Sequence, residues 1–148
     1  MQEQIDRDIK TAMLAGDKNK AEALRTIKSS ILNEAIALSS RDSGLTYEQV
    51  QKVLAREAKK RQEAADLYKT AGETARAQKE LNEKAIIDAY LPAQASEDDI
   101  KNAVAEEAAK LGDPSLADMG RIIGAVRGRL GPSSDGATIA RLVKEALQ

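Results

Sequence analysis

Four basic residues that share one face of an expected helix are the first candidates for binding chemistry. They are Lys52, Arg56, Lys59 and Lys60. The stretch from about residue 47 to 71 reads as one long helix, and at about 100° per residue the four side chains fall in a single stripe opposite the apolar positions. Such a stripe can neutralise the phosphates of a nucleic acid. The alternative is an ordinary solvated face of an amphipathic helix.

Two further charged residues of the same helix, Glu57 and Arg61, lie four positions apart near the middle of its apolar stripe. Charges on an apolar face carry a desolvation cost unless they are paired. We therefore expect a structural ion pair between them, with a functional cleft as the alternative. Glu80 and Glu83 could supply further partners for Arg61 if the next helix folds back as a hairpin.

A glycine-rich stretch between residues 119 and 131 forms the third candidate. Gly120, Gly124 and Gly128 recur every four residues and so fall roughly on one face of a helix. Each costs about 0.5–1 kcal/mol relative to Ala, which leads us to expect the close approach of another backbone. That backbone is either a tightly packed neighbouring helix or a phosphate backbone contacted by arginines. The basic residues around these glycines are Arg121, Arg127 and Arg129.

The composition excludes much of catalytic chemistry. The 148 residues include no His, Cys, Trp or Phe, and the formal net charge is -1. A Cys nucleophile, a His general base and any His or Cys metal site are therefore absent. No Gly-Lys-Ser/Thr phosphate loop is found either. We expect no catalytic residues, no cofactor and no metal.

Residue types that favour helices dominate the chain and predict an all-α fold. They are Ala, Leu, Glu, Lys, Gln and Arg, punctuated by only nine Gly and three Pro. The clearest boundary is at Pro92, because proline disfavours helical geometry in the residue before it. We predict an N-terminal helical domain of about four helices over residues 1–91, a linker over 92–95 and a C-terminal three-helix domain over 96–148.

Capping residues predict where the helices begin and end. Gly16 and Gly72 close two helices, Asp17 or Asn19 starts the second helix, and Asp135 starts the last one after a loop at 131–134. Capping-box spacing recurs in Thr46 with Gln49, Ser96 with Asp99, and Ser115 with Asp118. The apolar positions expected to face the core include Met13, Leu38 and Ala85.

No stretch of the sequence is apolar enough to cross a membrane. The longest run without a charged residue, 89–96, contains Pro92 and is far shorter than the roughly 20 residues that a spanning helix needs. The first turns carry several charges, so no signal-peptide pattern fits there. We expect no membrane partner and a cytoplasmic location.

An ordered set of residues along nearly the whole chain resembles the YqeY family. In the first part it comprises Asp8 to Met13, Leu24-Arg25, Ile27-Lys28, Lys59 to Glu63, Tyr68, Ala71-Gly72, Glu80, Glu83 and Tyr90-Leu91-Pro92. In the second part it comprises Met119-Gly120, Gly124, Gly131, Asp135-Gly136 and Leu142-Val143-Lys144. The chain departs from the family's pattern at Ala64, at Glu73 and in the loop 131–134.

The resemblance implies an all-α protein similar to the tail of the B subunit of the tRNA-dependent amidotransferase. It implies a tRNA-contacting role for the tail-like part. Members of the family are often described as carbon–nitrogen ligases with glutamine as amide donor. Three hypotheses follow: a non-catalytic tRNA-associated module, a helical adaptor for an aminoacyl-tRNA synthetase or amidotransferase, and an amide-transfer enzyme. The adaptor would use the glycine face and the acidic stretch from Ser96 to Leu111.

Overall fold

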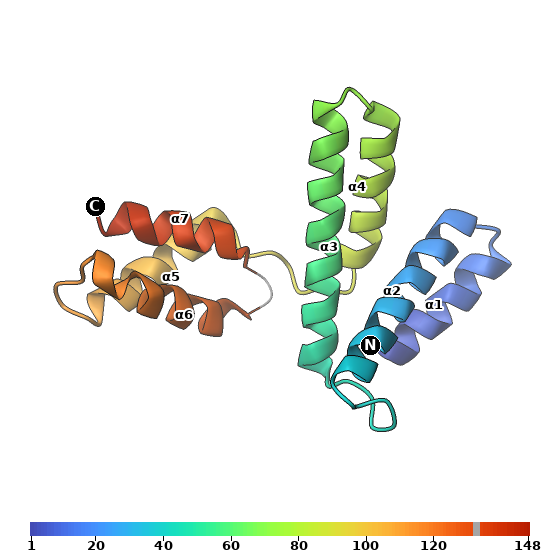
Figure 1. Ribbon diagram of the computed structural model, residues 1–148, viewed down its shortest axis with the longest axis horizontal. Helices are drawn as coiled ribbons and strands as arrows, with labels where there is room; N and C mark the ends of the chain where they lie inside the picture. Colours follow the sequence, from blue (N-terminus) through green and yellow to red (C-terminus); the bar gives the residue numbers. More distant parts are fainter. Residues whose placement is uncertain (132–133) are drawn as a thin grey trace. The chain divides into compact units, whose positions relative to one another are not determined.

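The computed structural model describes residues 1–131 and 134–148, and in these residues the regular structure is entirely helical (Figure 1). Its α-helices are α1 (Gln2–Leu14), α2 (Lys18–Ala37), α3 (Tyr47–Thr70), α4 (Thr74–Asp88), α5 (Glu97–Ala109), α6 (Met119–Leu130) and α7 (Gly136–Ala146), with a 3-10 turn, η1 (Leu116–Asp118), before α6. The predicted all-α fold is therefore confirmed. Of the loop predicted at 131–134, Pro132 and Ser133 lie outside the described residues.

The helices group into two compact units, Met1–Leu91 and Pro92–Gln148. We refer to them as the first and second unit and describe each by itself. Each has its own apolar core. That either unit folds independently stays a prediction.

The first unit is built from two helical hairpins, α1 with α2 and α3 with α4, and α2 packs against both α3 and α4 (Figure 1). Its core is aliphatic, because the sequence supplies no Phe or Trp. Leu24, Ile27 and Leu54 are its largest fully buried side chains besides Ile5. Two alanines of α3, Ala58 and Ala65, are buried where the helices pack.

The ends of the helices follow the predicted capping signals. The Asp17 carboxylate accepts a hydrogen bond from the Lys20 N–H at the start of α2. Complete capping boxes form at Thr46 with Gln49 and at Ser96 with Asp99. The third box, at Ser115, starts the short η1 turn rather than α6 itself. Gly16 and Gly72 end α1 and α3 with φ values of 74° and 75°, a backbone conformation that glycine adopts without strain.

Three apolar positions predicted to face the core are exposed. Met13 and Leu38, 54% and 47% exposed, lie at the ends of α1 and α2. Ala85 is also exposed, whereas Ile87 is 2% exposed and was not predicted. The buried face of α4 is rotated from the predicted one because Glu80 and Glu83 turn toward Arg61 of α3. Apolar spacing alone cannot find a buried face that carries carboxylates.

The segment that directly follows α4 is tied to the first helix of the chain. The Tyr90 hydroxyl donates a hydrogen bond to the Asp8 carboxylate of α1, and its ring packs on the core. Burial and the neighbouring Asp8 carboxylate raise the pKa of Tyr90 well above its ordinary value. The hydroxyl therefore stays protonated and remains a donor.

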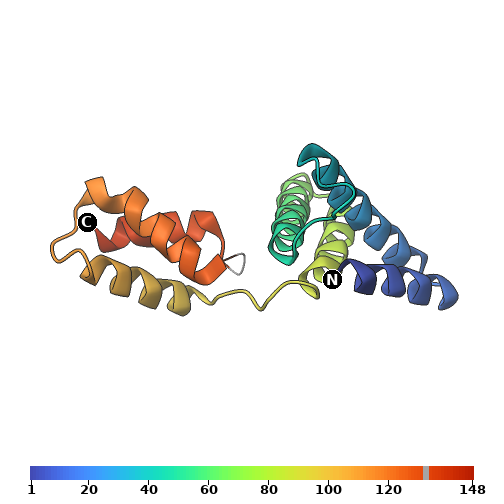
Figure 2. The same cartoon turned by 90° about the horizontal axis from the view of Figure 1, so that it is seen from below.

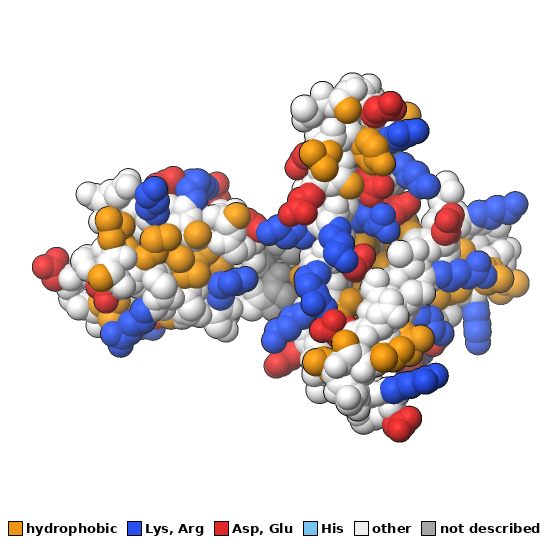
Figure 3. Space-filling view, in the orientation of Figure 1, with side chains coloured by type: hydrophobic (Ala, Val, Ile, Leu, Met, Phe, Trp, Pro, Cys, Tyr) orange, Lys and Arg blue, Asp and Glu red, His pale blue; other side chains and the backbone are white. Residues whose placement is uncertain are grey.

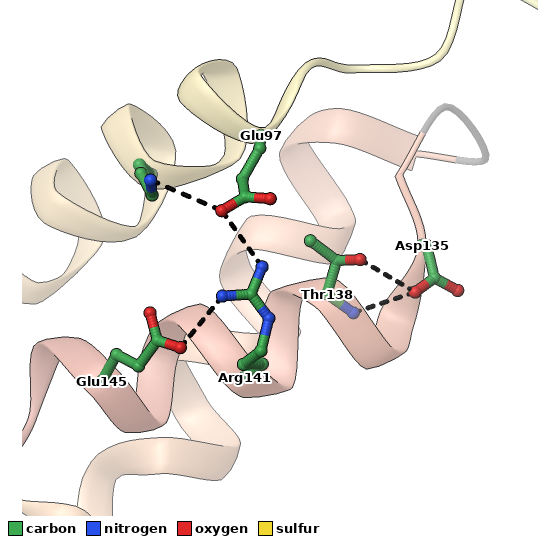
Figure 4. A network of polar contacts seen from close by, with 6 residues as sticks. Glu97, Asp135, Thr138, Arg141 and Glu145 are labelled. Carbon is green, nitrogen blue, oxygen red and sulfur yellow. Dashed lines mark hydrogen bonds and ion pairs between the residues drawn. The ribbon is translucent and has the colours of Figure 1, made fainter.

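In the second unit α5, α6 and α7 all pack against one another (Figure 2). Ile122, Val126, Ile139 and Val143 form the centre of its core. Ion pairs at the surface join the helices. The Glu97 carboxylate of α5 lies 3.1 Å from the Arg141 guanidinium of α7, which also pairs with Glu145 (Figure 4). Asp135 caps α7 by accepting from the Thr138 N–H.

None of the helices, over the residues that the structure describes, is both long enough and apolar enough to cross a membrane.

The capping box of α3 gives a first prediction. Thr46→Ala removes the acceptor for the Gln49 N–H and should destabilise the protein by about 1 kcal/mol. Thr26→Ala in exposed mid-α2 is the matched control and should cost nothing, because Ala is the better helix former. Urea denaturation followed by circular dichroism measures both, and equal effects of the two changes would contradict the role of the cap.

Candidate nucleic-acid interface

The basic stripe of α3 is exposed but largely neutralised within the first unit. The Arg56 guanidinium lies 2.7 Å from the Glu34 carboxylate of α2, and the Lys60 amine lies 2.8 Å from Glu57. Lys59 also has an interaction of its own. Lys52, in contrast, has no carboxylate within ion-pair distance among the described residues. The stripe therefore offers an incoming phosphate less charge than its four residues suggest.

The ion pair expected between Glu57 and Arg61 is not found, whereas the further pairing of Arg61 with Glu80 and Glu83 that a hairpin would allow is confirmed. Glu57 pairs with Lys60, and the Arg61 guanidinium lies 3.2 Å from both Glu80 and Glu83 on α4. Arg61 turns toward α4 because the hairpin brings two carboxylates to it, whereas Glu57 offers one. All three side chains of this cluster are at most 25% exposed. The cluster joins α3 to α4, which is a structural role.

The glycines of α6 lie on its solvent face. All three predicted positions, Gly120, Gly124 and Gly128, are exposed, and a Cβ added at any of them would meet no atom within 4 Å. Ile122 and Val126 hold the opposite face against the core. The predicted tight packing of a neighbouring helix on these glycines is therefore not found within the described chain.

Two of the three arginines beside the glycines are available for a ligand. Arg129 pairs with Glu106 of α5, and this carboxylate raises the pKa of Arg129. Arg121 and Arg127 have no carboxylate partner among the described residues. At about 100° per residue they lie roughly 60° to either side of the glycine face. The Arg127 guanidinium also lies close to Gly136, where an added Cβ would be 3.2 Å from it.

The open glycine face is costly for the isolated chain. Gly124 and Gly128 lie inside α6, where each Gly is less favourable than Ala by roughly 0.8–1 kcal/mol. No packing within the described chain offsets this cost. The face therefore suits a contact with another molecule whose backbone comes close to the helix, with Arg121 and Arg127 as flanking cations.

Sequence reasoning missed two features of the first unit. One is a groove of about 250 Å³ between α2 and α4, lined mainly by polar residues that include Asn19, Gln78 and Asn82. No spacing in the sequence predicts it, because it forms only where the two hairpins meet. The other is a group of exposed cations at the turn between α1 and α2 that have no carboxylate within ion-pair distance among the described residues: Lys10, Lys18, Lys20 and Arg25. In the described part of the chain, no cluster of His, Cys, Asp and Glu is arranged to hold a metal ion.

Comparison with known protein families tests the family resemblance that the sequence pattern indicated. The model of the family described as Yqey-like protein matches residues 2–147. The chain belongs to the YqeY family. None of the curated proteins compared with it matches. The YqeY match spans both units, so the α3–α4 hairpin and the glycine face of α6 both lie within the family's region.

The Arg61 cluster predicts that the stability of the protein depends strongly on the Arg61 guanidinium. Arg61→Met leaves Glu80 and Glu83 close together at a half-buried position, which should destabilise the protein by about 1–3 kcal/mol. The triple change Arg61→Met, Glu80→Gln and Glu83→Gln removes the uncompensated charges and should recover most of that loss. Thermal unfolding measures both proteins, and a melting temperature that Arg61→Met leaves unchanged would show that the cluster is not needed.

The surface ion pairs of α5 predict sensitivity to acid. Arg141 holds the pKa of Glu97 below its ordinary value, and Arg129 does the same for Glu106. Their contribution to stability is present above the ordinary pKa and is lost as the pH falls through the lowered one. We expect the denaturation midpoint to decrease below the ordinary glutamate range. The variant Glu97→Gln with Glu106→Gln should show a flatter pH profile, and an identical profile would contradict this origin.

Proposed function

We propose that this YqeY protein is a non-catalytic tRNA-associated module that contacts the phosphate backbone through the glycine face of α6. The observation that carries the proposal is the open face itself. Three exposed glycines have no chain atom within 4 Å of an added Cβ, and Arg121 and Arg127 flank them without carboxylate partners. A cytoplasmic location for the protein stays a prediction.

This arrangement suits a ligand that is both close and anionic. Without side chains on the face, another backbone can approach the helix surface directly. Guanidinium groups on both sides can then form charge-assisted hydrogen bonds to phosphate oxygens, which position a nucleic acid without reading its sequence. No arrangement of the described residues supports an amide-transfer step, and we propose none.

Filling the glycine face of α6 should raise stability and weaken tRNA binding at the same time. Gly124→Ala with Gly128→Ala should raise the free energy of unfolding by roughly 1–2 kcal/mol, because Ala favours the helix and the added Cβ atoms meet nothing. The same change should weaken binding of unfractionated tRNA, since it holds the ligand away. Urea denaturation and filter binding at low salt measure the two effects. A variant that is stabilised and binds tRNA as well as the natural protein would contradict close approach at this face.

The flanking arginines should determine the salt dependence of binding. Arg121→Gln with Arg127→Gln should lower the slope of log Kd against log salt by roughly 1.4–1.8, if each contacts one phosphate. Lys101→Gln with Lys144→Gln, on α5 and α7, is the charge-matched control and should leave the slope nearly unchanged.

A helical adaptor for a synthetase or amidotransferase is the other outcome that this experiment distinguishes. An absence of tRNA binding at low salt would overturn the proposal. Nuclease-resistant co-purification with such an enzyme, lost in Gly124→Leu, would then favour the adaptor.

A further inference from the structure

A second cationic surface lies in the first unit, at the turn between α1 and α2. Lys10 is in the last part of α1, Lys18 and Lys20 are in the first turn of α2, and Arg25 follows on α2. All four side chains are exposed. We refer to these residues as the turn patch. In Figure 3, Lys and Arg side chains gather around this end of the hairpin.

The turn patch is not neutralised by the chain. Within residues 1–131 and 134–148, none of its four side chains has a carboxylate within ion-pair distance. The nearby carboxylate of Asp17 is engaged as the cap of α2. Glu22 is the other acidic residue of this region, and it lines the groove toward α4. The patch therefore differs from the stripe on α3, where Arg56 and Lys60 are paired.

The placement of Lys18 and Lys20 is unfavourable within the helix. The first turn of α2 contains both lysines and no acidic residue. The N-terminal end of a helix carries a partial positive charge, which favours anions there and disfavours cations. The Asp17 carboxylate at the cap offsets part of this repulsion, and an anion contacted by the two lysines at the same end would offset more of it.

We propose that the turn patch is a second phosphate-contacting surface for RNA, so that each unit contributes one contact to a bound tRNA. This inference rests on the proposed function. The partner that the charges fit is a chain of closely spaced phosphates, which several cations around one hairpin end can contact together.

An anionic membrane surface is the competing partner, because Leu14 and Met13 are 91% and 54% exposed at the same turn. The structure favours RNA for two reasons. The Met13 sulfur is already contacted by the Arg25 guanidinium at 3.1 Å, so Leu14 is the one large apolar side chain among the described residues of this turn that lacks such a contact. One leucine contributes little to membrane binding, because even a whole myristoyl chain gives only marginal membrane binding.

The test compares three proteins in a salt titration with unfractionated tRNA. The patch variant carries Lys10→Gln, Lys18→Gln and Lys20→Gln, and it spares Arg25 because of its contact with Met13. The control variant carries Arg41→Gln, Lys69→Gln and Lys144→Gln, which removes three other exposed cations without carboxylate partners in the described chain. We expect the patch variant to bind at least about tenfold more weakly at 100 mM salt and to lower the salt slope by roughly 2 or more.

The outcomes separate this inference from the proposed function. If the natural protein does not bind tRNA at low salt, both are overturned. If Arg121→Gln with Arg127→Gln weakens binding but the patch variant matches its control, the inference alone is overturned. Sedimentation of the same proteins with vesicles of phosphatidylcholine and phosphatidylserine measures membrane binding. Vesicle binding lost in the patch variant, with tRNA binding intact, would overturn the RNA assignment in favour of a membrane surface.

Discussion

The packing of α3 against α2 and α4 is the interaction on which the first unit depends. Without disulfides, Phe or Trp, the unit must gain most of its stability from close contact between aliphatic helix faces. Val50, Val53 and Leu54 supply the bulk at one end of α3, and Ala58 and Ala65 let the helices approach farther along. The Arg61 cluster lies between α3 and α4, and its partly buried charges are paired with one another.

The packing of the helices also decides which of the basic residues seen in the sequence are paired with carboxylates. On α3, proximity to α2 brings Glu34 to Arg56, so a stripe that looks free in the sequence is partly paired in the fold. On α6, the solvent face is remote from α5 except at Arg129, and Arg121 and Arg127 stay unpaired within the described residues. The neighbours of a helix thus decide which of its charges stay unpaired. Among the described residues, unpaired cations group together at the glycine face of α6 and at the turn patch.

Much of the fold could be predicted because its signals are local. Capping boxes such as those at Thr46 and Ser96, and glycines such as Gly16, specify helix ends through contacts within a few residues. The candidate site was harder, since it depends on contacts between helices. From the sequence, Glu57 was expected to pair with Arg61, with Glu80 and Glu83 as further partners if α4 folded back as a hairpin. The hairpin and the two further partners are found, but Glu57 pairs with Lys60 instead. For the glycine face the sequence left open a packed neighbouring helix or an approaching phosphate backbone, and only the arrangement of the helices shows that no described atom packs on it.

The bond between Tyr90 and Asp8 has a mechanical consequence. Tyr90 lies two residues before Pro92, so it is among the last groups that the first unit holds before the second unit begins. Its ring is packed on the core and its hydroxyl is held by the first helix of the chain. Tension arriving through the connecting segment would therefore be shared between α4 and α1 rather than peeling the end of α4 away. The end of the first unit is thus held by a residue, Asp8, that lies more than eighty positions earlier in the chain than Tyr90.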